Sequence, residues 1–420
     1  MGLNVLVVDR AAPRTLIQGD ELIARQLFPR LRRRHRLTLL AAELPTVPGS
    51  LDLDGLFDAV RLVPRARRTP ALVGALEPLA ARLPGIRGRK GLGPLNLDFA
   101  RRFDAALHEL LAAERFDVVH VRQLPVGAYG VGIRHPARLL ELMDSETLAA
   151  DRSRVRGPRA LARRAVARVV EATIARRFDA ITTVAEADAA AVRRIAPGVE
   201  VTVVPNGVDA DYFEPGAADP LRHASEAKEL PAPGGIVFVG AMHFPPNVDA
   251  VRWFVADVLP RIRERRPDAT LHIVGRDPVP AVRELGTVPW VTVTGRVDDV
   301  RPYLEAASVV VCPMVSGGGI KNKLLEAMSM ARPVVVTSLA LGGLPLVDGR
   351  DLRVADDARR FAVAVVELLD DPVAAAGLGR SARDAVVSGF SWDAAAEAYD
   401  ELYGRLVARA ARAGAGLGRS

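Results

Sequence analysis

Short apolar segments alternate with amphipathic segments along the whole chain, and this alternation constrains the fold more than any other feature. In the second half, the apolar runs 235–239, 270–274, 290–294, 308–312 and 333–337 are typical of buried strands. Between the first two runs, apolar residues recur at helical spacing from Val248 to Ile262. Strands that alternate with helices build βαβ units with parallel sheets. The sequence therefore predicts an α/β fold.

The first half repeats this pattern less regularly. We expect strands at 4–8, 37–41, 117–121, 137–142, 180–184 and 200–204, and helices near 20–34, 98–114, 156–177 and 186–195. The segment 43–97 is rich in Pro, Gly and Arg, which is typical of irregular surface loops.

Length and composition predict two domains. A chain of 420 residues exceeds one typical domain, and 49% hydrophobic residues suffice for two cores. We expect an N-terminal domain over 1–205, a linker rich in Pro and Ala over 206–233, and a C-terminal domain over 234–391. We expect the helix 392–409 to cross back onto the first domain, and 410–420 to form a disordered tail.

Cysteine content, apolar runs and charge limit the class of protein. Cys312 is the single cysteine and lies in an apolar run, so we interpret it as a buried thiol. No charged leader precedes the strand at 4–8, and no window approaches about 18 apolar residues, so we expect a cytoplasmic protein. Residues 1–204 contain 33 Lys and Arg against 22 Asp and Glu, which favours an anionic partner for the first domain.

Three glycines precede a predicted helix in the stretch 316–328, which reads SGGGIKNKLLEAM. A helix N-terminus offers free N–H groups and a partial positive charge to an anion, and glycine lets a diphosphate approach these amides. Lys321 and Lys323 add two positive charges, and Glu326 could accept hydrogen bonds from sugar or ribose hydroxyls. The alternative is a flexible glycine turn with solvated lysines.

Glycines also follow three predicted strands of the second half, at Gly240, Gly275 and Gly295. In an open parallel sheet, ligands bind outside the carboxyl ends of the strands, so these glycines indicate a ligand cleft; tight turns are the alternative. Asn247 is a candidate N-cap for the next helix. His243 lies in the loop between Gly240 and Asn247. It could contact the sugar donor, or it could be an exposed loop residue without that role.

The common dinucleotide and hydrolase motifs are missing from the sequence. The glycine stretch lacks the Gly-Lys-Ser/Thr of a Walker A loop, and no G-x-G-x-x-G follows the strand at 4–8. The seven histidines are scattered without a His-Glu-x-x-His motif, and no Gly-x-Ser-x-Gly elbow occurs. We therefore expect neither a nicotinamide cofactor nor a catalytic zinc ion. The pairs Asp52/Asp54 and Asp209/Asp211 lack the strand context of a metal-binding motif, so we expect no metal.

Several motifs in combination resemble the retaining glycosyltransferases of the GT-B fold, specifically the bacterial glycosyltransferase family 4-like group. They are VPNGVD at 204–209, FVG at 238–240, GRVD at 295–298, LEAM at 325–328, RPVV at 332–335 and FSW at 390–392. The stretches PNVDA at 246–250, WF at 253–254 and GIKNK at 319–323 resemble an exopolysaccharide-associated sugar transferase subgroup. The resemblance covers nearly the whole chain and implies two Rossmann-like domains whose parallel sheets face a central cleft.

The resemblance implies roles for particular residues. In such enzymes the donor diphosphate binds the glycine-loop amides, here Gly318, Gly319 and Ile320, and a glutamate holds the ribose, here Glu326. The base lies near Arg296 and Val297, and an N-domain glycine loop near Gly19 faces the phosphates. Further donor contacts are expected at Gly240, His243, Asn247, Gly275, Lys321, Lys323 and Leu324.

The sequence departs from the family pattern in three places. Gly318 stands where the first glutamate of the Glu-x7-Glu motif is usual, which leaves the identity of the donor sugar open. The usual Arg and Lys of the first C-domain loop are missing, and Lys321 and Lys323 could supply that charge as catalytic residues. Asp144 follows the strand at 137–142 where many relatives have His, and it could orient the acceptor or act as a turn cap.

The sequence thus predicts a glycosyltransferase that moves a sugar from a nucleotide-diphosphate sugar to a glycan, lipid-linked or small-molecule acceptor, with retention and without a metal or cofactor. One alternative is a nucleotide-sugar epimerase of the same fold. The other is a degenerate transferase that binds its ligand without catalysis, which is suggested by Gly318 in place of the usual glutamate. Arginines alternate with apolar residues from Arg152 to Arg177, as in a solvated helix face or a helix that contacts an anionic membrane. No nucleic-acid module is recognised.

Overall fold

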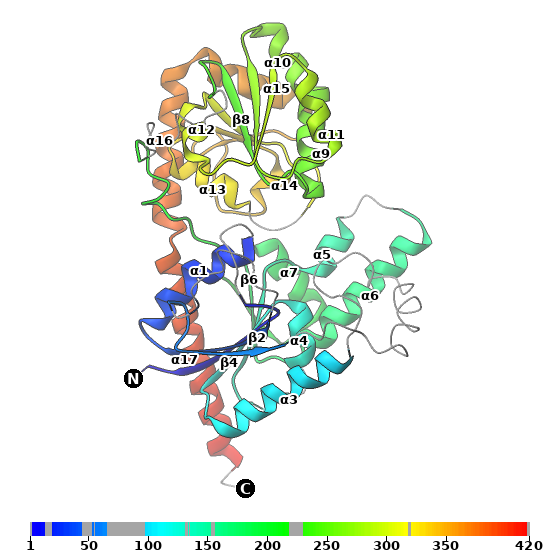
Figure 1. Cartoon of the computed structure of the whole chain (residues 1–420), viewed down its shortest axis with the longest axis vertical. Helices are drawn as coiled ribbons and strands as arrows, with labels where there is room; N and C mark the ends of the chain where they lie inside the picture. The colour runs from blue at the N-terminus through cyan, green and yellow to red at the C-terminus, as the bar shows by residue number, and fades with distance from the viewer. Residues whose placement is uncertain are drawn as a thin grey trace. The chain divides into compact units, whose positions relative to one another are not determined.

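The computed structural model describes residues 2–12, 19–43, 53, 55–64, 97–130, 133, 135–152, 156–217, 230–317 and 321–417. The chain divides into two compact units (Figure 1). Unit 1 comprises Met1–Pro205 and Trp392–Ser420, and unit 2 comprises Asn206–Ser391.

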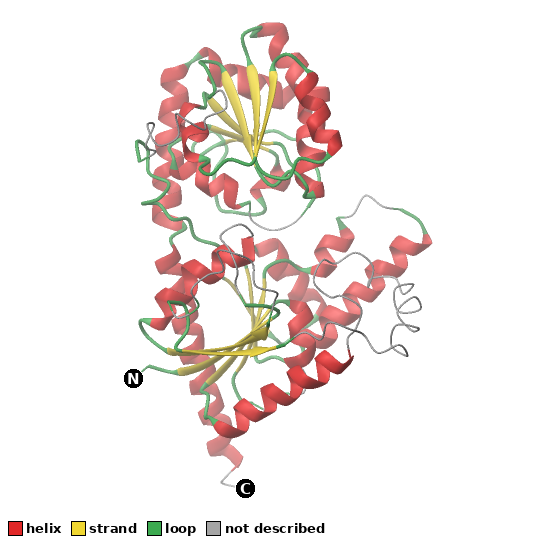
Figure 2. Ribbon diagram, viewed as in Figure 1, coloured by secondary structure: helices red, strands yellow, loops and turns green. Residues whose placement is uncertain are grey.

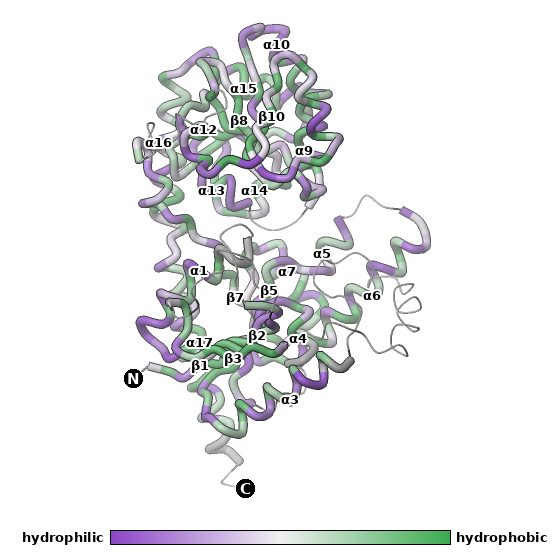
Figure 3. The backbone as a smooth tube through the Cα atoms, viewed as in Figure 1, coloured by the Kyte–Doolittle hydropathy of each residue, from purple (hydrophilic) through white to green (hydrophobic). Residues whose placement is uncertain are grey.

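Unit 1 is built on a seven-stranded parallel sheet with the order β3-β2-β1-β4-β5-β6-β7. Its strands are β1 (Asn4–Asp9), β2 (Arg36–Ala42), β3 (Ala59–Val63), β4 (Val118–Arg122), β5 (Arg138–Leu142), β6 (Ala180–Thr183) and β7 (Glu200–Val203). The central strands are hydrophobic and buried on both faces, as expected of a parallel sheet covered by helices (Figures 2 and 3). The strand order reverses between β1 and β4, so this is the topological switch point of unit 1.

The helices of unit 1 connect and cover these strands. They are α1 (Gly19–Arg32), α3 (Leu97–Ala113), α4 (Leu124–Gly130), α5 (Glu146–Asp151), α6 (Pro158–Ala175), α7 (Glu186–Ile195) and α17 (Trp392–Leu417). The last of these, α17, packs beside α1 and places Trp392, Tyr399, Leu402 and Tyr403 in the core under β1 and β2. The end of the chain therefore completes the hydrophobic core that the start of the chain begins.

Unit 2 has a six-stranded parallel sheet with the order β10-β9-β8-β11-β12-β13. Its strands are β8 (Gly235–Val239), β9 (Thr270–Val274), β10 (Val291–Gly295), β11 (Val309–Cys312), β12 (Val334–Val336) and β13 (Arg353–Val354). Here the order reverses between β8 and β11, so the loops after these two strands lie side by side at the switch point.

The helices of unit 2 are α9 (Pro245–Trp253), α10 (Leu259–Arg265), α11 (Pro280–Arg283), α12 (Arg301–Ala306), α13 (Asn322–Ser329), α14 (Ser338–Leu341), α15 (Ala358–Asp370) and α16 (Pro372–Gly389). A π-helical turn, η1 (Phe254–Val258), joins α9 to α10, and a 3₁₀ turn, η2 (Glu284–Thr287), follows α11. One hydrophobic core runs through the unit from β8 to α16.

Three sequence-based expectations are corrected by the structure. The segment 43–97 contains β3, which pairs only with β2 and is half exposed, so it lacks the continuous apolar run of the inner strands. The expected tail is helical as far as Leu417, because Ala410 packs on the core and the alanines that follow favour a helix. Asn247 is not an N-cap, since α9 is capped at Phe244 and begins with Pro245, a favoured first residue.

Candidate functional site

The candidate site lies at the carboxyl ends of β8, β9 and β11, at the switch point of unit 2. Gly240 follows β8 and Gly275 follows β9. A Cβ on Gly275 would lie 1.8 Å from the carbonyl oxygen of Gly240, and Gly275 has φ +149°, so a larger residue cannot stand there. A Cβ on Gly240 would lie 2.8 Å from Lys323 Nζ. Both glycines therefore allow other groups of the protein to approach the backbone closely, and the predicted ligand contact stays a prediction.

Lys323 projects from the first turn of α13 over this backbone. Its Nζ donates a hydrogen bond to Asn247 Oδ1 at 2.6 Å and lies 4.2 Å from the centre of the Phe238 ring. Asn247 in turn donates from Nδ2 to the carbonyl oxygen of Ala241 at 3.0 Å, which fixes the orientation of its amide. Burial is the main cause that lowers the pKa of Lys323 to about 8, and the nearby charge of Lys321 contributes to this lowering.

Lys321 occupies the residue before α13 and has an extended backbone with φ −95° and ψ 95°. Its Nζ lies 3.8 Å from where a Cβ of Gly317 would stand, so the ammonium is beside the glycine stretch. Gly318, Gly319 and Ile320 lie outside the described residues, so their predicted role is not tested. The two lysines thus lie at the start of α13, one just before the helix and one in its first turn.

Lysine is a rare residue in this chain, and the candidate site contains two lysines. The sequence contains four lysines and 53 arginines, and two of the four lysines are Lys321 and Lys323. Lysine presents a compact ammonium whose pKa responds to burial, whereas arginine presents a large planar group that stays charged. The space beside Gly240 and the ring of Phe238 suits the smaller cation.

Glu326 lies one turn further along α13. Burial raises the pKa of Glu326 to about 7, and the charge of Lys323 opposes this rise. The same carboxylate, after burial and Asp299, helps to raise the pKa of Tyr212, which stacks on Arg301 with the guanidinium 3.9 Å from the ring centre. The Glu326 carboxyl group is therefore close enough to interact electrostatically with Lys323 and with Tyr212.

Other predicted residues of unit 2 are distributed around this centre. His243 is half-buried in the loop after β8, with Nδ1 3.4 Å from Asp277 Oδ2. Arg296 is exposed after β10, and Val297 packs partly on the core. Leu324 differs, because its side chain is buried in the core and its N–H donates to the Lys321 carbonyl oxygen at 2.7 Å. The Leu324 side chain therefore packs α13 onto the core and is not available to contact a ligand.

Two predicted residues belong to unit 1. Gly19 is the first residue of α1. Asp144 is exposed in the loop after β5, immediately before Ser145, the N-cap of α5. Burial raises the pKa of Asp188 to about 6, and the charge of Asp144 contributes to that rise. Asp144 therefore lies at the carboxyl end of the unit 1 sheet, among acidic groups.

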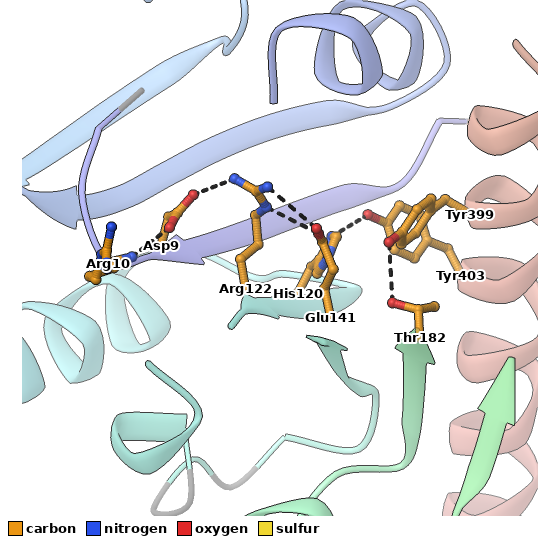
Figure 4. A network of polar contacts seen from close by, with 8 residues as sticks. All are labelled: Asp9, Arg10, His120, Arg122, Glu141, Thr182, Tyr399 and Tyr403. Atoms are coloured by element: carbon orange, nitrogen blue, oxygen red, sulfur yellow. Dashed lines mark hydrogen bonds and ion pairs between the residues drawn. The ribbon is translucent and has the colours of Figure 1, made fainter. Parts of the chain in front are cut away.

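A buried polar network in unit 1 was missed by sequence reasoning (Figure 4). Arg122 at the end of β4 bonds to Glu141 on β5, with Nε 3.0 Å from Oε2, and also to Asp9 at the end of β1. His120 Nε2 lies 3.0 Å from the same Glu141 oxygen. Burial disfavours the Glu141 carboxylate, but Arg122 and His120 outweigh it and lower the pKa of Glu141 to about 2. The available signal was a set of charged residues inside apolar strands.

Helix α17 joins this network through two tyrosines. The hydroxyl of Tyr403 lies 2.7 Å from His120 Nδ1, and the hydroxyl of Tyr399 lies 3.1 Å from Thr182 Oγ1 (Figure 4). All of these side chains are buried, so the network holds α17 to the sheet and offers little surface to a ligand.

The described residues contain neither a metal-type cluster nor a helix of the kind that spans a membrane. Within the ranges given above, no cluster of three or more His, Cys, Asp or Glu residues has the arrangement of a metal site. None of the helices that the structure describes is both long and apolar enough to span a bilayer. Cys312 is buried and free, as predicted, and burial raises the pKa of its thiol.

Each of the two units matches a known protein family. Residues 19–207 match the family described as "Glycosyl transferase 4-like domain", and residues 233–371 match "Glycosyl transferases group 1". The two matches together cover most of the chain.

Comparison with characterised proteins gives more distant relatives. Alpha-maltose-1-phosphate synthase of Mycolicibacterium smegmatis is 32% identical over 270 residues, which are 57% of this chain and 66% of that protein. GDP-mannose-dependent alpha-(1-6)-phosphatidylinositol monomannoside mannosyltransferase of Mycobacterium tuberculosis is 31% identical over 240 residues, 51% of this chain and 58% of that protein. The matches thus span less than two thirds of these relatives.

Solved structures share the fold over nearly the whole chain. Sucrose-phosphate synthase from Thermosynechococcus elongatus has a TM-score of 0.72 at 19% identity and covers 96% of this chain and 99% of its own. Anabaena HepE in complex with UDP-glucose has a TM-score of 0.66 at 14% identity, with 95% and 98% covered. At these identities the likeness concerns the fold alone.

Proposed function

Because the chain belongs to the glycosyltransferases of the GT-B fold, we propose that it transfers a sugar from a nucleotide-diphosphate sugar to the hydroxyl of an acceptor. The observation that carries this proposal is the placement of two lysines at the start of α13, with Lys323 beside Gly240 at the switch point of unit 2 and Lys321 beside Gly317. A diphosphate is the ligand that two ammonium groups at a helix N-terminus suit best. The complex of HepE with UDP-glucose supports a donor of this class.

In the proposed reaction, the bond between the anomeric carbon and the diphosphate oxygen breaks, a bond to the acceptor oxygen forms, and the proton of the acceptor hydroxyl passes to the leaving diphosphate. Negative charge develops on the leaving diphosphate. Lys321, Lys323 and the first amides of α13 would stabilise this charge, without any need for a metal ion. Glu326 would accept a hydrogen bond from the ribose, and Arg296 and Val297 would lie against the base. Retention at the anomeric carbon follows from the resemblance of the motifs.

For the acceptor, we propose that unit 1 binds it near the carboxyl end of its sheet and that Asp144 acts there. Asp144 is exposed in the loop after β5 and could orient the acceptor hydroxyl. A lipid-linked acceptor is one candidate, since one relative is named as acting on a phosphatidylinositol monomannoside. Asp144→Asn should then lower kcat while leaving donor affinity unchanged.

The donor is tested first by a thermal-shift screen against UDP-, GDP- and dTDP-sugars, followed by calorimetry with the best ligand. The double variant Lys321→Ala/Lys323→Ala should lose at least about tenfold in affinity, because two charge-assisted contacts are removed. The matched control is Lys90→Ala/Lys228→Ala, which removes the other two lysines of the sequence and the same charge.

Three results would contradict the proposal. Equal donor affinity in the two double variants would remove the role of Lys321 and Lys323. Conversion of the donor sugar in the absence of any acceptor would indicate an epimerase. Tight donor binding without turnover against any acceptor extract would indicate a binding protein, for which Gly318 is the motive in the sequence.

A further inference from the structure

The outward face of α6 in unit 1 carries apolar residues. Leu161 is 64% exposed, Val166 38%, Val169 64% and Val170 44%. We call these four residues the α6 ridge. Among the described residues, thirteen large apolar side chains are exposed, and four of them are on this one helix. The solvent face of a helix in a globular protein is ordinarily polar, so the α6 ridge has the composition of a contact surface.

Helical geometry places the middle of the ridge, Val166 and Val169, on the side of α6 opposite the core, with Leu161 and Val170 on its two flanks. Ala160, Glu171, Ile174 and Ala175 are buried, and α6 packs there against α4, α5 and α7. Val166 and Val169 fall between these positions at a spacing that places them on the opposite side of the helix. Ala162 and Thr173 extend the same stripe by one turn in each direction. The apolar stripe is therefore not an extension of the core.

Arginines border the ridge. Those that are exposed on α6 and just after it are Arg159, Arg163, Arg168, Arg176 and Arg177. Glu171, the carboxylate of this helix, points inward and accepts hydrogen bonds from Ser145 Oγ and the N–H of Thr147. The outward face of α6 therefore carries arginines and no carboxylate.

A surface hollow adjoins the ridge at Val169. It is lined by three arginines, Arg168, Arg176 and Arg194, and by one carboxylate, Asp151. Asp151 Oδ2 lies 3.5 Å from Arg168 and 3.9 Å from Arg194, and Arg176 donates to the carbonyl oxygen of Ile195 at 2.9 Å. Positive charge exceeds negative charge in the hollow, so it can accept a phosphate group.

We propose that α6 docks unit 1 on an anionic lipid bilayer. The α6 ridge would enter the boundary between headgroups and acyl chains, while the bordering arginines and the hollow bind lipid phosphates. Charge complementarity favours this occupant, because arginines along an apolar stripe match a surface that is apolar inside and anionic outside. The inference goes beyond the transfer reaction and does not depend on it, since binding to vesicles needs neither donor nor acceptor.

Co-sedimentation of the full chain with vesicles tests the proposal. Vesicles of phosphatidylcholine with about one third phosphatidylglycerol should bind the protein, pure phosphatidylcholine should bind it far more weakly, and added salt should release it. Val166→Asp/Val169→Asp should weaken binding at least about tenfold, since charge replaces inserted apolar area. The matched control is Val373→Asp on α16 of unit 2, where the exposed fraction is 80%.

The arginines have their own comparison. Arg159→Gln/Arg163→Gln should weaken binding about fivefold per residue, whereas Arg360→Gln in unit 2, whose side chain is 83% exposed, should not. Circular dichroism and a thermal melt show that each variant is folded. The proposal is overturned if the wild type stays in solution with anionic vesicles, or if the ridge variants bind as well as Val373→Asp. It is also overturned if light scattering shows a dimer that the ridge variants lose, because a second copy would then cover α6.

Discussion

Lys323 Nζ donates to Asn247 Oδ1 at 2.6 Å, and this bond joins the first turn of α13 to α9 across the carboxyl end of β8. The carbonyl oxygen of Ala241 accepts from Asn247 Nδ2 at 3.0 Å, so the amide oxygen can only face the ammonium. Asn247 thus positions the charge that the proposed site presents to a diphosphate. Its own side chain is buried, which makes it a positioning residue for Lys323.

Asn247→Ala should weaken binding of the donor nucleotide about tenfold, because a hydrogen bond to a charged group contributes about 1.5–3 kcal/mol. Calorimetry on the folded variant measures this. Asn4→Ala is the matched control, since Asn4 also donates to a backbone carbonyl, that of Arg115 at 2.7 Å, but in unit 1. Unchanged affinity in Asn247→Ala would show that Lys323 needs no positioning.

Donor affinity should be highest between about pH 7 and pH 8. The pKa of Lys323 is lowered to about 8, so its ammonium is lost as pH rises through that value and the attraction to a diphosphate falls. The pKa of Glu326 is raised to about 7, so its carboxylate is lost as pH falls below that value and the ribose contact weakens.

The two limbs of this profile separate the two groups. Calorimetry from about pH 6 to pH 9 should show that Lys323→Ala abolishes the alkaline fall and Glu326→Gln abolishes the acid fall. The diphosphate diester of a nucleotide sugar does not titrate in this range, so the ligand contributes neither limb. A profile that is the same in Lys323→Ala and in the wild type would contradict the assignment.

Gly240→Ala and Gly275→Ala should fail in different ways. The new Cβ at Gly240 meets the ends of two side chains, Asn247 Nδ2 and Lys323 Nζ, both at 2.8 Å, and these can move. Donor affinity should fall at least about tenfold with a stability loss of only about 1 kcal/mol. The new Cβ at Gly275 meets the Gly240 carbonyl oxygen at 1.8 Å, so this variant should lose about 3 kcal/mol.

Urea unfolding and calorimetry together distinguish these outcomes. Gly349→Ala serves as a control for backbone strain alone, because Gly349 has φ +78° and no atom stands within 4 Å of its Cβ position. If Gly240→Ala bound donor normally, Gly240 would be no more than a turn residue, which was the alternative left open by the sequence.

The sequence predicted the fold and pointed to candidate site residues, but it did not predict the contacts between these residues. Gly240, Asn247 and Lys323 each stand out in a motif, because strand ends and helix starts leave local signals. The bond between Asn247 and Lys323 joins residues 76 positions apart, and helix capping offered a local role for Asn247 that proved wrong. Leu324 was expected to contact the donor because of its position in a motif, but its position on the helix directs the side chain toward the core.

The contacts of the polar network in unit 1 could not be predicted from the sequence. Its charged members are in three different strands and its tyrosines come from the last helix, so no local pattern links them. A charged residue inside an apolar strand indicates a buried partner, but only the sheet order β1-β4-β5 shows which one. For the same reason the role of α17 could be expected as a helix that returns to unit 1, but its contacts could not.

Glu141→Gln should be among the most destabilising substitutions in unit 1. The Glu141 pKa is lowered to about 2 from 4.5, so the carboxylate contributes stability that is fully present above pH 4.5 and is lost as pH falls toward 2. That shift corresponds to about 3 kcal/mol at neutral pH. Glutamine would leave Arg122 buried with Asp9 as its remaining carboxylate, and breaking a buried pair costs about 3–5 kcal/mol.

Urea unfolding at pH 7 and at pH 4 measures this effect. The wild type should lose more stability between the two values than Glu141→Gln, because the variant has no carboxylate to protonate at that position. Glu109→Gln is the matched control, since Glu109 forms an exposed pair with Arg61 at 3.6 Å and surface pairs contribute about 0–1 kcal/mol. If Glu141→Gln were as stable as Glu109→Gln, Arg122 would be satisfied by Asp9 alone, and α17 would depend on its apolar contacts with α1 rather than on this network.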